Sequence, residues 1–213
     1  VFDSRDNCNA IINTATEELV TGCKATIIPD GVMTIGTYAF ALLGTSLDKI
    51  TIPESVETIS DAAFYNTQLQ EITLPKNLNT IGKYAFRQNS SLKSVTIPAT
   101  VRTIEDQAFM GCAGLEEVIS MIDEPAAISD HTFTKFGWTW TEATLYVPSG
   151  TKDKYVATDG WKNFKNIVEI GDQDNAVQHA LTQNNKPSTL YNLQGMKMAN
   201  VSKRKGIYIL DGH

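Results

Sequence analysis

The chain has 213 residues, of which 42% are hydrophobic and 20% charged, a balance typical of a globular protein that can bury a sizeable core. Its formal net charge of −6 argues against nucleic-acid binding, because a phosphate-binding surface needs clustered lysines and arginines. No apolar stretch approaches the roughly 18 residues that a membrane-spanning helix needs, so we expect no membrane insertion in this segment.

Residues 1–25 form a short, irregular unit and are predicted to be an N-terminal cap. The opening VFDSRDNC lacks an initiator Met and a signal-peptide core, so we expect a removed leader or a cut from a longer protein. Cys23 takes a position that leucine holds in later units. If Cys8 takes the same phase one coil earlier, either a disulfide or two small buried thiols fits there.

Residues 26–118 repeat one sequence motif, called the repeated phrase below. Its clearest copies, TIPESVETISDAAF, TLPKNLNTIGKYAF and TIPATVRTIEDQAF, begin at Thr51, Thr73 and Thr96. Four units align on prolines spaced by 24, 22 and 23 residues: Pro29, Pro53, Pro75 and Pro98. A fixed period of roughly 20–29 residues with Leu and Ile at set offsets is typical of a leucine-rich solenoid.

Each unit of about 23 residues predicts one short strand and one single helical turn. In KITIP, Ile50 and Ile52 alternate with Thr51, so the isoleucines face inward and the threonine outward. The proline ends the strand, because it has no N–H for the sheet ladder. The following AF segment suits a helical turn, and its phenylalanine is expected to join one interior column: Phe40, Phe64, Phe86 and Phe109.

Aliphatic residues also recur at set distances after each proline. Two such columns are Val32, Val56, Leu78 and Val101, and Ile35, Ile59, Ile81 and Ile104. One coil cannot bury these side chains, whereas stacked coils form ladders of like residues and so create a shared core.

Residues 119–170 depart from the phrase and are predicted to be a C-terminal capping repeat. The segment VISMIDEPAAI breaks the pattern, and ATLYVPSGTKDKY supplies one more strand over residues 145–147. An apolar lid over the last coil is expected from Tyr155, Trp161, Phe164 and Ile167.

Residues 171–187 are polar and predict a linker, and residues 188–213 contain two apolar-alternating runs that predict a small β-hairpin. A lone hairpin is marginal in water. It is therefore expected to dock on the solenoid, pair with another chain, or belong to a segment that continues beyond it.

The repeated phrase, the opening DSRDNCNAIINTAT…GCKATIIP and the closing ATLYVPSGTKDKY together resemble the BspA-like leucine-rich repeat family of bacterial surface proteins. The resemblance covers residues 3–170. It implies a right-handed solenoid, a surface or secreted location, and adhesion to host matrix proteins or other cells. The tail YNLQGMKM…KGIYILDG resembles a C-terminal segment of secreted proteins of gut and oral anaerobes. No binding residue is shared across the family, so none is carried over.

No residue pattern predicts catalysis, a metal or a cofactor. The histidines lie far apart, without metal or catalytic spacing: His131, His179 and His213. Glycoside hydrolysis needs two carboxylates across a cleft, so the pairs Glu116–Glu117 and Asp123–Glu124 are interpreted as solvated charges on turns. We therefore expect a protein that is not an enzyme and needs no cofactor.

Two features are candidate binding surfaces. The first is the outward row of the predicted sheet, here named the polar strand face: Lys49, Thr51, Glu71, Thr73, Ser94 and Thr96. Solenoids use such faces for binding, although threonine also suits any solvated strand. The second and weaker candidate is Trp138 with Trp140, which suit a protein or carbohydrate contact if exposed and complete the cap if buried.

These features predict a non-catalytic binding module, secreted or on the bacterial surface, that engages protein ligands such as host extracellular matrix, with carbohydrate as a second candidate ligand. The alternative is a structural spacer or assembly unit, in which the C-terminal hairpin joins chains. A glycan-processing enzyme is the third class, and it would depend on Asp123 or Glu124.

Overall fold

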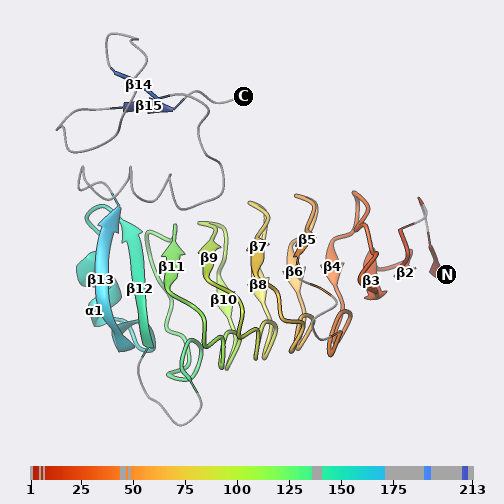
Figure 1. Cartoon of the computed structure of the whole chain (residues 1–213), viewed down its shortest axis with the longest axis horizontal. Coiled ribbons are helices and arrows are strands. Elements are labelled where there is room, and N and C mark those ends of the chain that lie inside the picture. Colours follow the sequence, from red (N-terminus) through yellow and green to blue (C-terminus); the bar gives the residue numbers. More distant parts are fainter. Residues whose placement is uncertain are drawn as a thin grey trace. The chain divides into compact units, whose positions relative to one another are not determined.

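The computed structural model describes residues 2–4, 6, 8–43, 47, 49–135 and 141–170, together with the backbone of 190–192 and 208–210. It divides into two compact units, Val1–Val168 and Glu169–His213. The first unit is a row of stacked coils, as predicted for a leucine-rich solenoid (Figure 1). Trp138 and Trp140 lie outside the described residues. The finer division into cap, repeats, linker and tail stays a prediction.

One strand of each coil follows the predicted pattern. These strands are β5 (Lys49–Thr51), β7 (Glu71–Thr73), β9 (Ser94–Ile97), β11 (Glu117–Ser120) and β12 (Thr141–Pro148). β5 pairs with β7, β9 with β11 and β11 with β12, each in parallel and in register, so that Ile50 lies opposite Ile72 and Val95 opposite Val118. The strand β13 (Phe164–Ile170) ends this side of the solenoid next to β12.

Each coil also contains a second strand, where the sequence predicted only one. These strands are β4 (Thr34–Ile35), β6 (Thr58–Ile59), β8 (Thr80–Ile81) and β10 (Thr103–Ile104). They pair in parallel, and β1 (Phe2–Asp3), β2 (Ile11–Asn13) and β3 (Glu18–Thr21) complete a seven-stranded sheet at the N-terminal end. A turn after the proline, closed by Val56 N–H donating to Pro53 O at 3.1 Å, redirects the chain into this second strand.

The predicted helical turn at the AF segment is wrong, because the structure has hydrogen-bonded turns there. The residue two before each phenylalanine has a positive φ, which is 51° at Ala62 and 62° at Tyr84. A left-handed residue interrupts an α-helix. The N–H groups instead reach the next coil, as when Phe64 N–H donates to Ala85 O at 2.8 Å. Each coil is thus bonded to its neighbour on a third side as well.

The phenylalanine column is confirmed. Ring centroids are 5.1 Å apart for Phe40 and Phe64, 5.3 Å for Phe64 and Phe86, and 5.1 Å for Phe86 and Phe109, with all planes nearly parallel. Phe133 adds a fifth ring at 5.0 Å from Phe109. Alignment on prolines misses this ring, since the nearest preceding proline is out of phase. The predicted lid is also confirmed, because all four of its side chains are buried: Tyr155, Trp161, Phe164 and Ile167.

The described helices are few and short: α1 (Lys152–Ala157) and the 3₁₀ turn η3 (Trp161–Asn163). Both lie in residues 141–170, called the cap below, whose Trp161 and Phe164 rings contact Phe133. None of the described helices is long and apolar enough to cross a membrane. In the second unit, β14 (Leu190–Asn192) pairs antiparallel with β15 (Tyr208–Leu210), in agreement with the predicted hairpin strands.

Candidate functional site

The polar strand face lies on β5, β7 and β9. Lys49 sits opposite Glu71 and Thr51 opposite Thr73, and all four side chains are exposed. Because side chains alternate along a strand, Ile50 and its partners anchor the other side in the core. The two predicted residues on β9, Ser94 and Thr96, are half-buried. The structure therefore presents the two strands that carry the Lys–Glu pair more openly than the third.

The structure extends this face with residues that the sequence reasoning missed. Glu117 pairs with Ser94 on one side and with Thr144 on the other, and Asn166 Nδ2 donates to Thr144 Oγ1 at 3.0 Å. A signal for Glu117 was present, because it precedes an inward Val118 as Lys49 precedes an inward Ile50. The polar row thus continues to β13.

The face has a second row of outward positions, two residues further along each strand, and this row becomes apolar toward the C-terminal cap. Ile119 lies opposite Thr96 and Tyr146, and it is buried although it faces away from the core cluster. Burial raises the pKa of the Tyr146 hydroxyl, and the negative charge of Glu117 raises it further. The face therefore carries hydroxyl groups and opposite charges along its length, and at one end it has the half-buried Tyr146 beside the buried Ile119. This mixture suits a protein contact.

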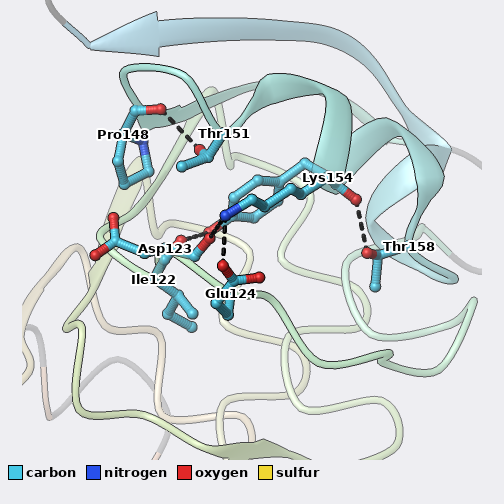
Figure 2. Close-up of polar contacts among 8 residues, drawn as sticks. Ile122, Asp123, Glu124, Pro148, Thr151, Lys154 and Thr158 are labelled. Carbon is cyan, nitrogen blue, oxygen red and sulfur yellow. Dashed lines mark hydrogen bonds and ion pairs between the residues drawn. The ribbon is translucent and has the colours of Figure 1, made fainter.

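The acidic pair at Asp123 and Glu124 lies at the cap (Figure 2). Lys154 Nζ, from α1, contacts Glu124 Oε1 at 2.5 Å and donates to the backbone oxygen of Asp123 at 3.2 Å. The Glu124 side chain is 79% exposed. Lys93 pairs in the same way with Glu116, at 3.0 Å. Glu124 and Glu116 form surface ion pairs, in agreement with their interpretation as solvated charges. Glu117 departs from that interpretation, because it is half-buried on the strand β11 and does not lie on a turn.

The helix α1 is positioned by two hydroxyl groups that Figure 2 also shows. Thr151 Oγ1 donates to Pro148 O at 2.7 Å before the helix begins, and Thr158 Oγ1 donates to Lys154 O at 2.6 Å after it ends. The two bonds fix the short helix at both ends, so that Lys154 is held over the turn that carries Glu124.

The cysteines do not form a disulfide in the structure. Cys8 is buried, whereas Cys23 is exposed and its Sγ lies 3.5 Å from the backbone oxygen of Asn9. The sequence allowed either a disulfide between Cys8 and Cys23 or two buried thiols. The structure has neither arrangement, since one thiol is buried and the other is exposed. Burial raises the pKa of Cys112 to about 12, which leaves this thiol unreactive.

The described residues contain no group of three or more His, Cys, Asp or Glu side chains that could hold a metal ion. His131 is exposed, while His179 and His213 lie outside the part of the chain that the structure describes. Among the described residues, the polar strand face carries charges of both signs in register, since Lys49 lies opposite Glu71.

Comparisons with known proteins place the chain among repeat proteins. A family model described as a BspA type leucine rich repeat region matches residues 18–136 in six copies. The pneumococcal vaccine antigen PcpA is 19% identical with a TM-score of 0.54, over 79% of this chain and 47% of that protein. A leucine rich cell surface protein from Faecalibacterium prausnitzii A2-165 is 23% identical with a TM-score of 0.51, over 83% of this chain and 41% of that protein.

At these identities the two solved structures show a shared fold alone. This chain spans less than half the length of either one. Among curated proteins, none matches the chain.

Proposed function

Because this chain belongs to the BspA-type leucine-rich repeat family, we propose that it is a non-catalytic protein-binding module, either secreted or displayed on the bacterial cell surface. Its binding surface is the polar strand face. The two similar solved structures include a cell surface protein and a vaccine antigen, which supports this location.

The observation that carries the proposal is the register of the exposed side chains. Lys49 faces Glu71 and Thr51 faces Thr73 across two short strands whose inward isoleucines are buried. The strands are fixed by backbone pairing, so the backbone of this face has little conformational freedom left to lose when a ligand binds. Preorganised surfaces lose less conformational entropy on binding.

The proposed ligands are host extracellular matrix proteins or proteins on other cells. Hydroxyl groups can donate and accept hydrogen bonds, and a Lys–Glu pair offers both charges within one contact area, so the face is complementary to polar protein surfaces. Carbohydrate is the second proposed ligand class, through Trp138 and Trp140, which lie outside the described residues.

A triple variant tests the polar strand face: Lys49→Glu, Glu71→Lys and Thr73→Arg. It reverses the charge pattern and fills the threonine row. We expect binding to a panel of immobilised matrix proteins, measured by surface plasmon resonance, to weaken by at least about tenfold.

The matched control is Lys24→Glu, Glu105→Lys and Thr16→Arg, three exposed positions that lie on none of the strands β5, β7 and β9. It makes the same charge changes and should leave the affinity within about twofold of the wild type. Equal affinities for the wild type and the polar-strand-face variant would remove this face as the binding surface.

The antiparallel pair of β14 and β15 favours a second candidate function, that of a structural spacer or assembly unit. A two-stranded pair is marginally stable by itself in water. It would gain stability by pairing with another chain, and the unit would then link copies together.

A further inference from the structure

The strand β10 is the last strand of the seven-stranded sheet among the described residues. In every earlier coil, backbone N–H groups donate to carbonyl oxygens of the preceding coil in the same pattern. Asn79 N–H and Thr80 N–H donate to Glu57 O at 2.8 and 3.2 Å, and Gly82 N–H donates to Ile59 O at 2.8 Å. One coil later, Arg102 and Glu105 repeat these bonds.

By this repetition, the backbone oxygens of Arg102 and Ile104 should accept hydrogen bonds from the next coil. The segment that reaches this place is 124–128, yet no backbone hydrogen bond joins it to β10 in this described part of the chain. Arg102 O and Ile104 O are thus the acceptors of an open sheet edge, and such edges are templates for strand pairing.

The cap holds segment 124–128 away from β10. Ile128 N–H donates to Asp159 O at 3.1 Å, and Trp161 Nε1 donates to Ala126 O at 2.9 Å. Gly160 lies so close that a Cβ there would come within 2.4 Å of Ile128 O. Pro125 stands eight residues before Phe133, where Val101 stands before Phe109, and it has no N–H to give.

The separation leaves a cavity of about 290 Å³ between β10 and segment 124–128. Its apolar wall includes Ile104, Ile122 and Trp161, and its mouth includes the exposed Ala126 and Ala127. Ile104 is 8% exposed, whereas Ile35, Ile59 and Ile81 in the same column are 0% exposed. The column of isoleucines thus ends at Ile104, beside a space that segment 124–128 of the next coil does not fill.

The cavity and the open edge of β10 beside it are called the groove below. We propose that this groove binds an extended peptide segment of a partner protein, which adds a parallel strand to the edge of β10. Its N–H groups donate to Arg102 O and Ile104 O, and one aliphatic side chain enters the cavity beside Ile104. The preferred sequence is set by the ladder itself, since β4, β6, β8 and β10 are all Thr-Ile. Main-chain pairing would supply affinity and the cavity would supply specificity. The groove is separate from the polar strand face and does not depend on it.

The test uses the full chain and a fluorescent peptide with the sequence SVETIS, which copies residues 55–60. We expect saturable binding by fluorescence anisotropy, with amide shift changes in NMR spectra concentrated at residues 102–104. Replacing the peptide's isoleucine by aspartate, or methylating the N–H of its last serine, should each weaken binding by at least about tenfold. These peptide changes leave the protein untouched, so its folding cannot confuse the result.

Two protein variants complete the test. Ala127→Trp places a large side chain at the mouth of the groove and should weaken binding by at least about tenfold. Ala113→Trp makes the same change at an exposed alanine that does not line the cavity, and should leave affinity within about twofold. The polar-strand-face variant should also bind SVETIS normally.

The proposal is overturned if no saturable binding occurs below ~1 mM peptide. It is also overturned if Ala127→Trp binds as well as the wild type, or if the amide shifts fall on another surface. Self-association of the chain that Ala127→Trp abolishes, without any binding of SVETIS, would assign the groove to a second copy and reject the peptide. Failure of the polar-strand-face proposal would not overturn this one, because the two surfaces have no residue in common.

Discussion

At the scale of single residues, Asn89 joins two coils through its side-chain amide. It is 0% exposed and lies three residues after Phe86. Its Nδ2 donates to Phe64 O at 2.7 Å and Phe86 O at 2.9 Å, while its Oδ1 accepts from Leu69 N–H at 2.9 Å and Thr67 Oγ1 at 2.8 Å. All polar atoms of this amide are thereby satisfied within the core.

Replacing Asn89 with alanine should lower the free energy of unfolding by at least about 3 kcal/mol, because several buried backbone groups lose their partners at once. Urea denaturation followed by circular dichroism measures the loss. The matched control is Asn77→Ala, since Asn77 is exposed and its Nδ2 makes one bond, to Glu54 O at 2.9 Å. A loss at position 89 as small as that of the control would contradict the role of this amide.

Tyr155 anchors the cap through its hydroxyl. The group donates to Ile122 O at 2.7 Å and lies 2.6 Å from Ser120 Oγ. Since the hydroxyl has one proton and gives it to the carbonyl, Ser120 donates to the tyrosine oxygen. Burial raises the pKa of Tyr155 to about 12, and the charge of Asp123 contributes in the same direction.

This shift predicts a loss of stability at alkaline pH. Between the ordinary pKa of 10.0 and the folded value of about 12, the unfolded chain releases the Tyr155 proton while the folded chain keeps it. The free energy of unfolding should therefore fall as the pH rises through this window. The stabilisation that comes from the raised pKa of Tyr155 is fully present below pH 10.

Tyr155→Phe should reduce that alkaline decline, and at neutral pH it should cost about 1–3 kcal/mol, because the Ser120 hydroxyl loses its acceptor and Ile122 O loses its donor. Urea midpoints measured at intervals across the alkaline range give both effects. The control Tyr65→Phe should keep the steep decline of the wild type. An unchanged decline in Tyr155→Phe would show that other groups cause it.

At the scale of elements, the phenylalanine column connects the coils through their interior. Phe86 stacks on Phe64 at 5.3 Å and on Phe109 at 5.1 Å, and all three rings are fully buried. The turns that carry the rings are bonded from coil to coil, so the backbone spacing fixes the stacking distance. Removal of one ring leaves a cavity that neither neighbour can fill without breaking those bonds.

Phe86→Ala should therefore lower the free energy of unfolding by ~3–5 kcal/mol in denaturant titration. Leu42→Ala is the control, because Leu42 belongs to the same kind of turn but is 67% exposed. It should cost less than about 1 kcal/mol. A comparably small loss for Phe86 would reject the view that the column stabilises the solenoid.

At the scale of the whole molecule, the two candidate functions predict different roles for the tail. A binding module needs the solenoid alone, so we expect the same number of chains per particle, taken as particle mass divided by chain mass, with and without residues 188–213. Multi-angle light scattering over a range of concentrations measures this. Fewer chains per particle after removal of the tail would instead support the assembly role, in which β14 and β15 pair between chains.

Much of this architecture could be predicted from the sequence. The period of about 23 residues, the inward isoleucines, the phenylalanine column and the lid all follow from like residues at like offsets. When each coil has the same length, such residues must stack directly above one another, and burial then selects the apolar ones. The polar strand face could be predicted for the same reason, because it is the alternate set of the same strands.

The tertiary structure decided what depends on contacts between coils and cap. Left-handed residues such as Ala62 replaced the expected helical turn with bonds to the next coil. Glu117 and Tyr146 joined the polar strand face because β11 pairs in parallel with β9 and with β12. The groove beside β10 exists because Asp159, Gly160 and Trp161 hold the last segment elsewhere. A repeat specifies its own neighbours through its spacing, whereas the end of a repeat is set by whichever distant side chains pack against it.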